Sequence, residues 1–135
     1  MCIRDSDCVV LRHGSAELVR LAEAKLAGAA TDPARYRAVL GGLFDQPGGA
    51  RIDVIVNACT HFPLVEAELT PVAPAGVRFV DGGPGIARRI AFLTEGQRWP
   101  AGESVHRAVF TRLGAAERAL APALAGYGIG TIEEL

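Results

Sequence analysis

The feature that most constrains the fold is a short β-branched run at residues 52–58 (IDVIVNA). A run of this length and composition is typical of a buried strand in a parallel sheet. It is followed by Cys59-Thr60-His61 and then by Pro63, which is expected to open a helix. Two more short apolar runs predict strands, at residues 77–80 and 105–111. Strands that alternate with helices indicate βαβ units, so we expect an α/β fold with a mostly parallel sheet and flanking helices.

Helix-period patterns occupy the segments between these strands. Ser15 is placed to cap a helix over residues 16–27, and Asp32-Pro33 is typical of a second helix start. The remaining segments predict helices over residues 86–93 and 115–124, a loose tail over 130–135, and an internal boundary at the prolines of 70–75.

Composition argues against several classes of protein. The 135 residues carry 14 Lys plus Arg and 15 Asp plus Glu, for a net charge of -1. Nucleic-acid binders are usually basic, so no nucleic-acid partner is expected. No apolar run approaches the roughly 20 residues that a bilayer span needs, so no membrane partner is expected. The cysteines do not form a disulfide framework, so a reducing cytoplasm is the default localisation.

The cysteines and histidines do not form a metal or disulfide pattern. Cys2, Cys8 and Cys59 lack the paired spacing of a disulfide framework or a zinc site. His13 and His106 have no companion ligands nearby in the sequence. We therefore expect neither a metal nor another cofactor.

Residues 1–12 form a doubtful leader. The segment is too short and too charged for a signal peptide and has no helical or strand period. We expect a non-native leader, and the alternative is a frayed natural N-terminus.

The strongest candidate for chemistry is Cys59-Thr60-His61. Ligands of open α/β sheets bind beyond the carboxyl ends of the strands, which is where these residues fall. A thiol ahead of a helix start is favoured as thiolate, which can act as a base or nucleophile, and an adjacent imidazole can polarise it. The alternatives are a buried inert Cys59, a core or capping His61 and an ordinary N-cap Thr60.

A second candidate is Gly83-Pro84-Gly85, which follows a predicted strand and opens a helix. Arg88 stands where a dinucleotide-binding motif needs its third glycine. We therefore expect a tight strand-to-helix turn, with anion binding at the helix start as the alternative.

Residues 59–64 (CTHFPL), preceded by the apolar strand 53–56, resemble the C-terminal catalytic signature of glutamate racemases. Residues 80–89 (VDGGPGIARR) are similar to the next block of that family, and 106–111 to its closing strand. The resemblance implies a two-lobed enzyme, an isomerase that interconverts L- and D-glutamate by cofactor-independent proton transfer between two thiols. It implies that D-glutamate serves peptidoglycan synthesis, and that a homodimer is one state open to the full-length protein.

Carried over by motif, Cys59 is one of the two catalytic cysteines. Thr60 and His61 match positions that contact the substrate, the small molecule glutamate, and His61 is also expected to assist Cys59. Asn57 and Ala58 depart from the Leu-Gly that usually precedes the cysteine.

The larger departure is that the motif of the family's other cysteine and its early Asp-Ser-Gly loop do not occur here. We therefore expect an N-terminally truncated fragment that is inactive alone. Residues 13–76 would be part of one lobe, and residues 77–135 would complete the other lobe, most of which is missing. Apolar surface should then be exposed. The alternatives are a related amino-acid racemase, a Cys/His-dependent enzyme, or a non-catalytic α/β binding domain.

Overall fold

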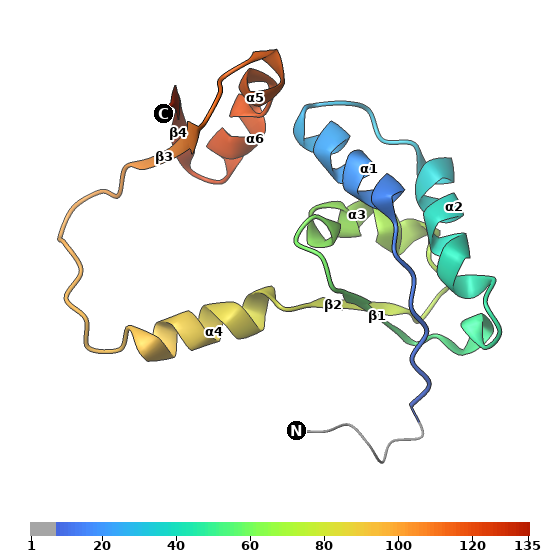
Figure 1. Cartoon of the computed structure of the whole chain (residues 1–135). Helices are drawn as coiled ribbons and strands as arrows, with labels where there is room; N and C mark the ends of the chain where they lie inside the picture. The colour runs from blue at the N-terminus through green and yellow to red at the C-terminus, as the bar shows by residue number, and fades with distance from the viewer. Residues whose placement is uncertain (1–7) are drawn as a thin grey trace.

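The computed structural model describes residues 8–135, which form two units joined by a projecting helix and a long connection (Figure 1). The part of the predicted leader at residues 1–7, with Cys2, lies outside the described residues. The first unit contains α1 (Ala16–Leu26), α2 (Pro33–Phe44), β1 (Val54–Asn57), α3 (Glu66–Leu69) and β2 (Arg78–Asp81). Then α4 (Gly83–Leu93) leads away to the second unit, which contains β3 (His106–Phe110), α5 (Ala115–Ala119), α6 (Ala121–Gly126) and β4 (Ile129–Glu134).

The strands pair in parallel, as the alternation of strands and helices predicted. β1 pairs with β2, in a register that runs from Val54 opposite Arg78 to Asn57 opposite Asp81. β3 pairs with β4, with an irregularity after His106. Within the described residues these are two separate two-stranded sheets, and the α/β class with parallel strands and flanking helices is confirmed.

The two N-terminal helices begin where their capping residues predicted. The Ser15 Oγ accepts a hydrogen bond from the Leu18 N–H at 3.0 Å, and the Asp32 carboxylate accepts one from the Ala34 N–H at 2.9 Å. Pro33 occupies the first turn of α2, where its missing N–H costs nothing. Both helices then bury one face each.

Three of the predicted elements differ in the structure. The helix expected from Pro63 is a 3₁₀ turn (Phe62–Val65) followed by the single turn of α3. The helix expected over 115–124 divides at Leu120, because Pro122 has no N–H to donate and its ring crowds the carbonyl four residues earlier. The expected loose tail at 130–135 is wrong, since most of it is β4.

The apolar core lies between the helices and β1 (Figure 1). Its members come from α1, α2, β1, the 3₁₀ turn and α3: Leu18, Leu21, Ala22, Tyr36, Val39, Leu40, Ile55, Val65 and Leu69. The helix α1 packs against the 3₁₀ turn that follows Cys59, and Ala22 and Val65 on these two elements are 0% exposed. This contact fixes the position of the Cys-Thr-His segment.

The chain beyond β2 is packed far more loosely. α4 contains no buried residue, and its apolar side chains are exposed: Ile86, Ile90, Phe92 and Leu93. The strand residue Val109 and the connection residue Trp99 are also exposed. The apolar surface expected after residue 77 is therefore present.

Two further observations bear on the sequence predictions. None of the helices described over residues 8–135 combines the length and the apolar character that crossing a membrane requires. The predicted division into lobes at residues 13–76 and 77–135 stays a prediction. The strand β2, which belongs to the second of these ranges, pairs with β1 of the first.

Candidate active site

The segment that carries the candidate residues is a tight turn at the carboxyl end of β1. The Phe62 N–H donates to the Cys59 carbonyl at 3.1 Å, and the Leu64 N–H donates to the His61 carbonyl at 3.1 Å. Asn57, the last residue of β1, is 6% exposed, and its Nδ2 donates to Glu66 Oε2 at 3.4 Å. The strand end is thus tied to α3, and the turn between them has little freedom.

Cys59 and His61 face each other across this turn. The Cys59 Sγ lies 3.7 Å from the His61 Nδ1, a contact whose donor depends on the imidazole tautomer. Cys59 is half-buried, and the His61 side chain is 34% exposed. The structure therefore brings together the thiol and the imidazole that the sequence singled out, with both accessible from solvent.

A carboxylate that sequence analysis did not identify completes the arrangement. The Glu23 Oε1, on the last turn of α1, lies 3.5 Å from the His61 Nε2. A carboxylate on one ring nitrogen favours a proton there and leaves the other nitrogen free to face the thiol. Glu23, His61 and Cys59 thus form a line of three groups suited to moving a proton at the Cys59 sulfur. No local sequence signal marks Glu23, because it reaches His61 only through the packing of α1 on the turn.

Thr60 lies between the other two residues and is exposed. Its position at the strand end leaves the hydroxyl available to a ligand above the turn.

The structure does not place Cys59 ahead of a long helix whose N-terminus would favour the thiolate. The segment after Cys59 is a 3₁₀ turn of four residues and an α-helix of four residues. A helix dipole is the sum of aligned peptide units over several turns, so these pieces supply little of it. The case for Cys59 rests instead on His61 and Glu23.

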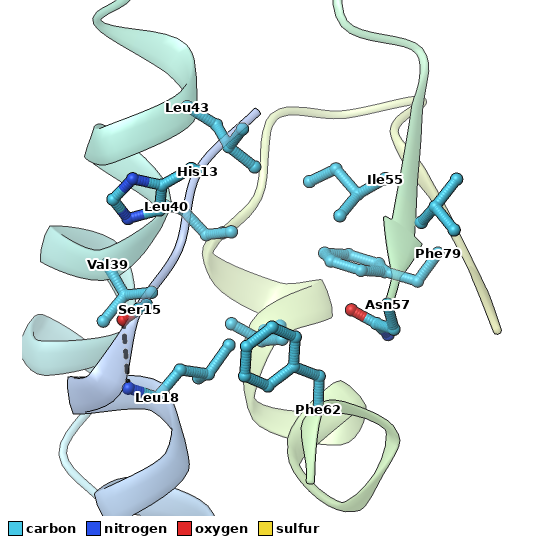
Figure 2. Close-up of a pocket in the computed structure, with 12 residues that line it drawn as sticks. His13, Ser15, Leu18, Val39, Leu40, Leu43, Ile55, Asn57, Phe62 and Phe79 are labelled. Atoms are coloured by element: carbon cyan, nitrogen blue, oxygen red, sulfur yellow. Dashed lines mark hydrogen bonds between the residues drawn. The ribbon is translucent and has the colours of Figure 1, made fainter. Parts of the chain in front are cut away.

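Two cavities lie beside the turn rather than at the thiol. One of about 50 Å³ lies between α1, α2 and β1, and Figure 2 shows Leu18, Leu40, Ile55 and Phe62 directed toward it. The other, of about 820 Å³, runs along β1 beside residues 8–13. Cys59, Thr60 and His61 line neither of these two cavities.

The second motif forms a tight strand-to-helix turn. The Gly83 N–H, at the first position of α4, donates to the Asp81 carboxylate at 2.5 Å. This contact uses one of the free N–H groups that an anion would bind. The structure thus favours the turn interpretation of Gly83-Pro84-Gly85.

The remaining histidines lie in other segments of the chain. The His13 ring lies against Gly42 of α2, where an added Cβ would be 2.2 Å from it. His106 begins β3 and is exposed.

Comparison with known proteins gives a consistent result, although no protein-family model matches the chain. The chain is 54% identical over 126 residues to the glutamate racemase of Sphingopyxis alaskensis, an alignment that covers 92% of this chain and 46% of that protein. It is 39% identical over 131 residues to the glutamate racemase of Salmonella typhimurium, covering 96% and 46%.

A solved structure agrees with these relatives. The Escherichia coli glutamate racemase in complex with L-glutamate and the activator UDP-MurNAc-Ala matches with a TM-score of 0.76 at 38% identity, over 90% of this chain and 46% of that chain. The fold and the Cys-Thr-His turn therefore define the class as an α/β domain of the racemase type. More narrowly, the chain is a homologue of the glutamate racemases and corresponds to their C-terminal part. It spans about half the length of the curated relatives that it matches.

Proposed function

We propose that this chain supplies one catalytic half of a glutamate racemase, with Cys59 as one of two thiols that invert the Cα of glutamate. The observation that carries the proposal is the line of Glu23, His61 and Cys59 at the carboxyl end of β1, in a chain 54% identical to a glutamate racemase over 126 residues.

The chemistry requires a base on one face of Cα and an acid on the other. In one direction the Cys59 thiolate takes the Cα proton, so that the S–H bond forms as the Cα–H bond breaks and the electron pair remains on the substrate. A thiol on the opposite face then gives its proton to Cα. In the reverse direction Cys59 is the donor, and no cofactor takes part in either step.

His61 and Glu23 support this exchange without holding the substrate proton. His61, with Nδ1 at 3.7 Å from the sulfur, stabilises the thiolate when it is protonated and orients the thiol when it is neutral. Glu23 at 3.5 Å from Nε2 holds the ring in place. Thr60, exposed at the strand end, is placed to bind a carboxylate of glutamate.

The proposed reaction also needs the part of the protein that this chain does not cover. A single thiol cannot both remove a proton from one face and deliver one to the other, so the second thiol comes from the half of the relatives that this chain does not cover. We further propose that residues 77–135 complete that other lobe, because α4 has no buried residue and exposes an apolar face. D-Glutamate made in the cytoplasm would then serve peptidoglycan synthesis.

A chimera tests the proposal directly. Residues 8–135 replace the matching C-terminal part of the Sphingopyxis alaskensis enzyme, and interconversion of D- and L-glutamate is followed by circular dichroism of the amino acid. We expect racemisation, no turnover of aspartate, and loss of racemisation in Cys59→Ser. In deuterated water the Cys59→Ser protein should still exchange the Cα hydrogen of one enantiomer, through the remaining thiol.

The control is Cys8→Ser, which removes the other described thiol, an exposed one. It should leave the rate unchanged. A folded chimera without activity, or full activity in Cys59→Ser, would contradict the proposal. The 135-residue chain alone should be inactive.

A further inference from the structure

The only lysine in the sequence joins α1 to the segment that carries the candidate site, and every other basic residue is an arginine. The Lys25 Nζ donates to the Leu64 carbonyl at 2.8 Å and to Glu68 Oε2 at 2.8 Å. These acceptors lie 39 and 43 residues further along the chain. A compact ammonium with three donors can serve two acceptors that lie in different directions, which the planar fork of arginine does less readily.

Each partner belongs to the backbone or side chains that hold the site. The Leu64 N–H closes the turn by donating to the His61 carbonyl, and Lys25 binds the carbonyl of the same residue, in the next peptide group. Glu68 lies on α3, whose neighbour Glu66 accepts from Asn57 at the end of β1. Lys25 therefore binds both the 3₁₀ turn, through Leu64, and the helix α3, through Glu68.

The contact is well enclosed for a charged pair. The Lys25 and Glu68 side chains are 33% and 19% exposed. Tyr36 of α2 is 1% exposed, and burial together with the charge of the Glu68 carboxylate raises the pKa of Tyr36. An ion pair screened from water in this way holds a more defined geometry than a surface pair.

The same end of α1 carries Glu23, whose carboxylate reaches His61. α1 packs against the turn, where Ala22 and Val65 are both 0% exposed, and this packing sets how closely α1 approaches it. Apolar contact does not by itself set how far α1 slides along the turn, since it is not directional. The two hydrogen bonds from Lys25 are directional, and they fix that position.

We propose that Lys25 is a positioning residue for the candidate site: by binding the Leu64 carbonyl and Glu68, it holds Glu23 in reach of His61 and so holds His61 against Cys59. This inference rests on the proposed function only in taking Cys59 as the working thiol. It makes a claim about the reactivity of that thiol in the chain itself.

Alkylation of Cys59 in the 135-residue chain tests the inference without requiring racemase activity. Iodoacetamide labelling at neutral pH is followed by mass spectrometry of tryptic peptides, because residues 52–78 form one peptide in which Cys59 is the only thiol. The exposed Cys8 falls in another peptide and reports the reagent concentration in the same sample. Circular dichroism confirms that each variant is folded.

Lys25→Met should lower the Cys59 labelling rate about ten-fold, the lower end of the effect expected from losing a charged hydrogen bond. The same substitution in a His61→Gln background should change the rate less than about two-fold, because Lys25 acts through His61. Arg20→Met is the matched control. It also removes a positive charge from α1, but Arg20 pairs with Glu17 on an exposed face, so the rate should stay unchanged.

A second variant tests the same contact with a smaller change, in case Lys25→Met does not fold. Glu68→Gln keeps the side-chain volume and an acceptor oxygen but removes the charge that Lys25 binds, and it should lower the rate about two-fold in the same direction. Equal effects of Lys25→Met in both backgrounds would overturn the inference, as would equal effects of Lys25→Met and Arg20→Met, or an unchanged rate in Glu68→Gln. If the chimera of the preceding section were inactive while these rates behaved as expected, the proposed function would fail and the positioning role would stand.

Discussion

Tyr36→Phe should make the protein more stable, although the substitution removes a polar group from a native side chain. Tyr36 is 1% exposed and belongs to the core between α1, α2 and β1. Its hydroxyl, buried as well, makes no hydrogen bond to any residue in the described part of the chain.

The expected gain follows from the cost of burying an unpaired hydroxyl. Protein mutational data put that cost at about 1–3 kcal/mol. Removing one oxygen also loses some packing contact, so a net gain of about 1–2 kcal/mol in the free energy of unfolding is expected. The direction is informative, because most single substitutions lower stability, typically by about 1 kcal/mol.

Urea unfolding followed by far-UV circular dichroism measures this free energy. The matched control is Tyr127→Phe, since Tyr127 is 65% exposed and its change should stay within about 0.5 kcal/mol. A Tyr36→Phe protein no more stable than the original would refute the reasoning, since it would mean that the hydroxyl is stabilised where it lies.

The pH dependence of the same difference gives a second check. Burial, together with the Glu68 carboxylate, raises the pKa of Tyr36 above its ordinary 10.0. Above about pH 10 the unfolded chain therefore releases the phenol proton while the folded chain retains it, and stability falls as the pH rises. Tyr36→Phe lacks this loss, so its advantage should widen as the pH is raised above 10. A constant difference would contradict the assignment.

Three further predictions concern the first unit. Leu69→Ala, at a core residue that is 1% exposed, should lower the free energy of unfolding by about 2–5 kcal/mol in urea titrations. Ser15→Ala removes the cap that accepts from the Leu18 N–H and should cost about 1 kcal/mol in the same assay; no loss would mean that the cap is replaced by water. Hydrogen bonds from Arg35 and then Arg20 lower the pKa of Glu17 below its ordinary 4.5, so the contribution of the α1–α2 ion pair is present above that value and is lost as the pH falls through the folded pKa. Arg35→Met should therefore flatten the acid side of the stability curve, and an unchanged slope would contradict this.

The elements that the sequence predicted well are those whose ends are decided locally. Ser15 and Asp32-Pro33 begin α1 and α2 because each cap acts on the N–H groups two or three residues ahead. β1 was likewise marked by its own β-branched run, which lies within the predicted residues 52–58. The proximity of Cys59 and His61 could be predicted for the same reason, since they are two residues apart and share one turn.

The elements that were missed depend on distant partners. β4 contains Gly130 and two consecutive glutamates, which hide a strand pattern, and its pairing partner β3 lies some twenty residues earlier. In the structure Arg107 of β3 contacts Glu133 at 3.2 Å, and the Leu135 N–H donates to the Phe110 carbonyl at 2.8 Å. Neither contact has a local signature. The short α3 was overpredicted because Pro63 and Leu64 fit a helix pattern equally well as a 3₁₀ turn.

Glu23 and Lys25 show the same limit within the site. Both lie in the polar part of an amphipathic helix, where a charged residue usually needs no explanation other than solvation. Their partners, His61 and Leu64, are about forty residues away, and the packing of α1 against the 3₁₀ turn brings them together. Tertiary contact, rather than any motif, decides which surface charges of α1 belong to the site.

The distribution of buried residues explains how this chain can hold the Cys-Thr-His turn in place by itself. Every member of the buried core lies between Leu18 and Leu69, so the contacts that shape the Cys-Thr-His turn are all made within one unit. The residues from α4 onward add no fully buried hydrophobic side chain, and neither cavity reaches Cys59. On the proposed function, the position of Cys59 and His61 is thus set by this chain alone, whereas the enclosure of the substrate and the opposing thiol depend on the other half. Thiol reactivity should therefore be measurable in the isolated chain even where racemisation is not.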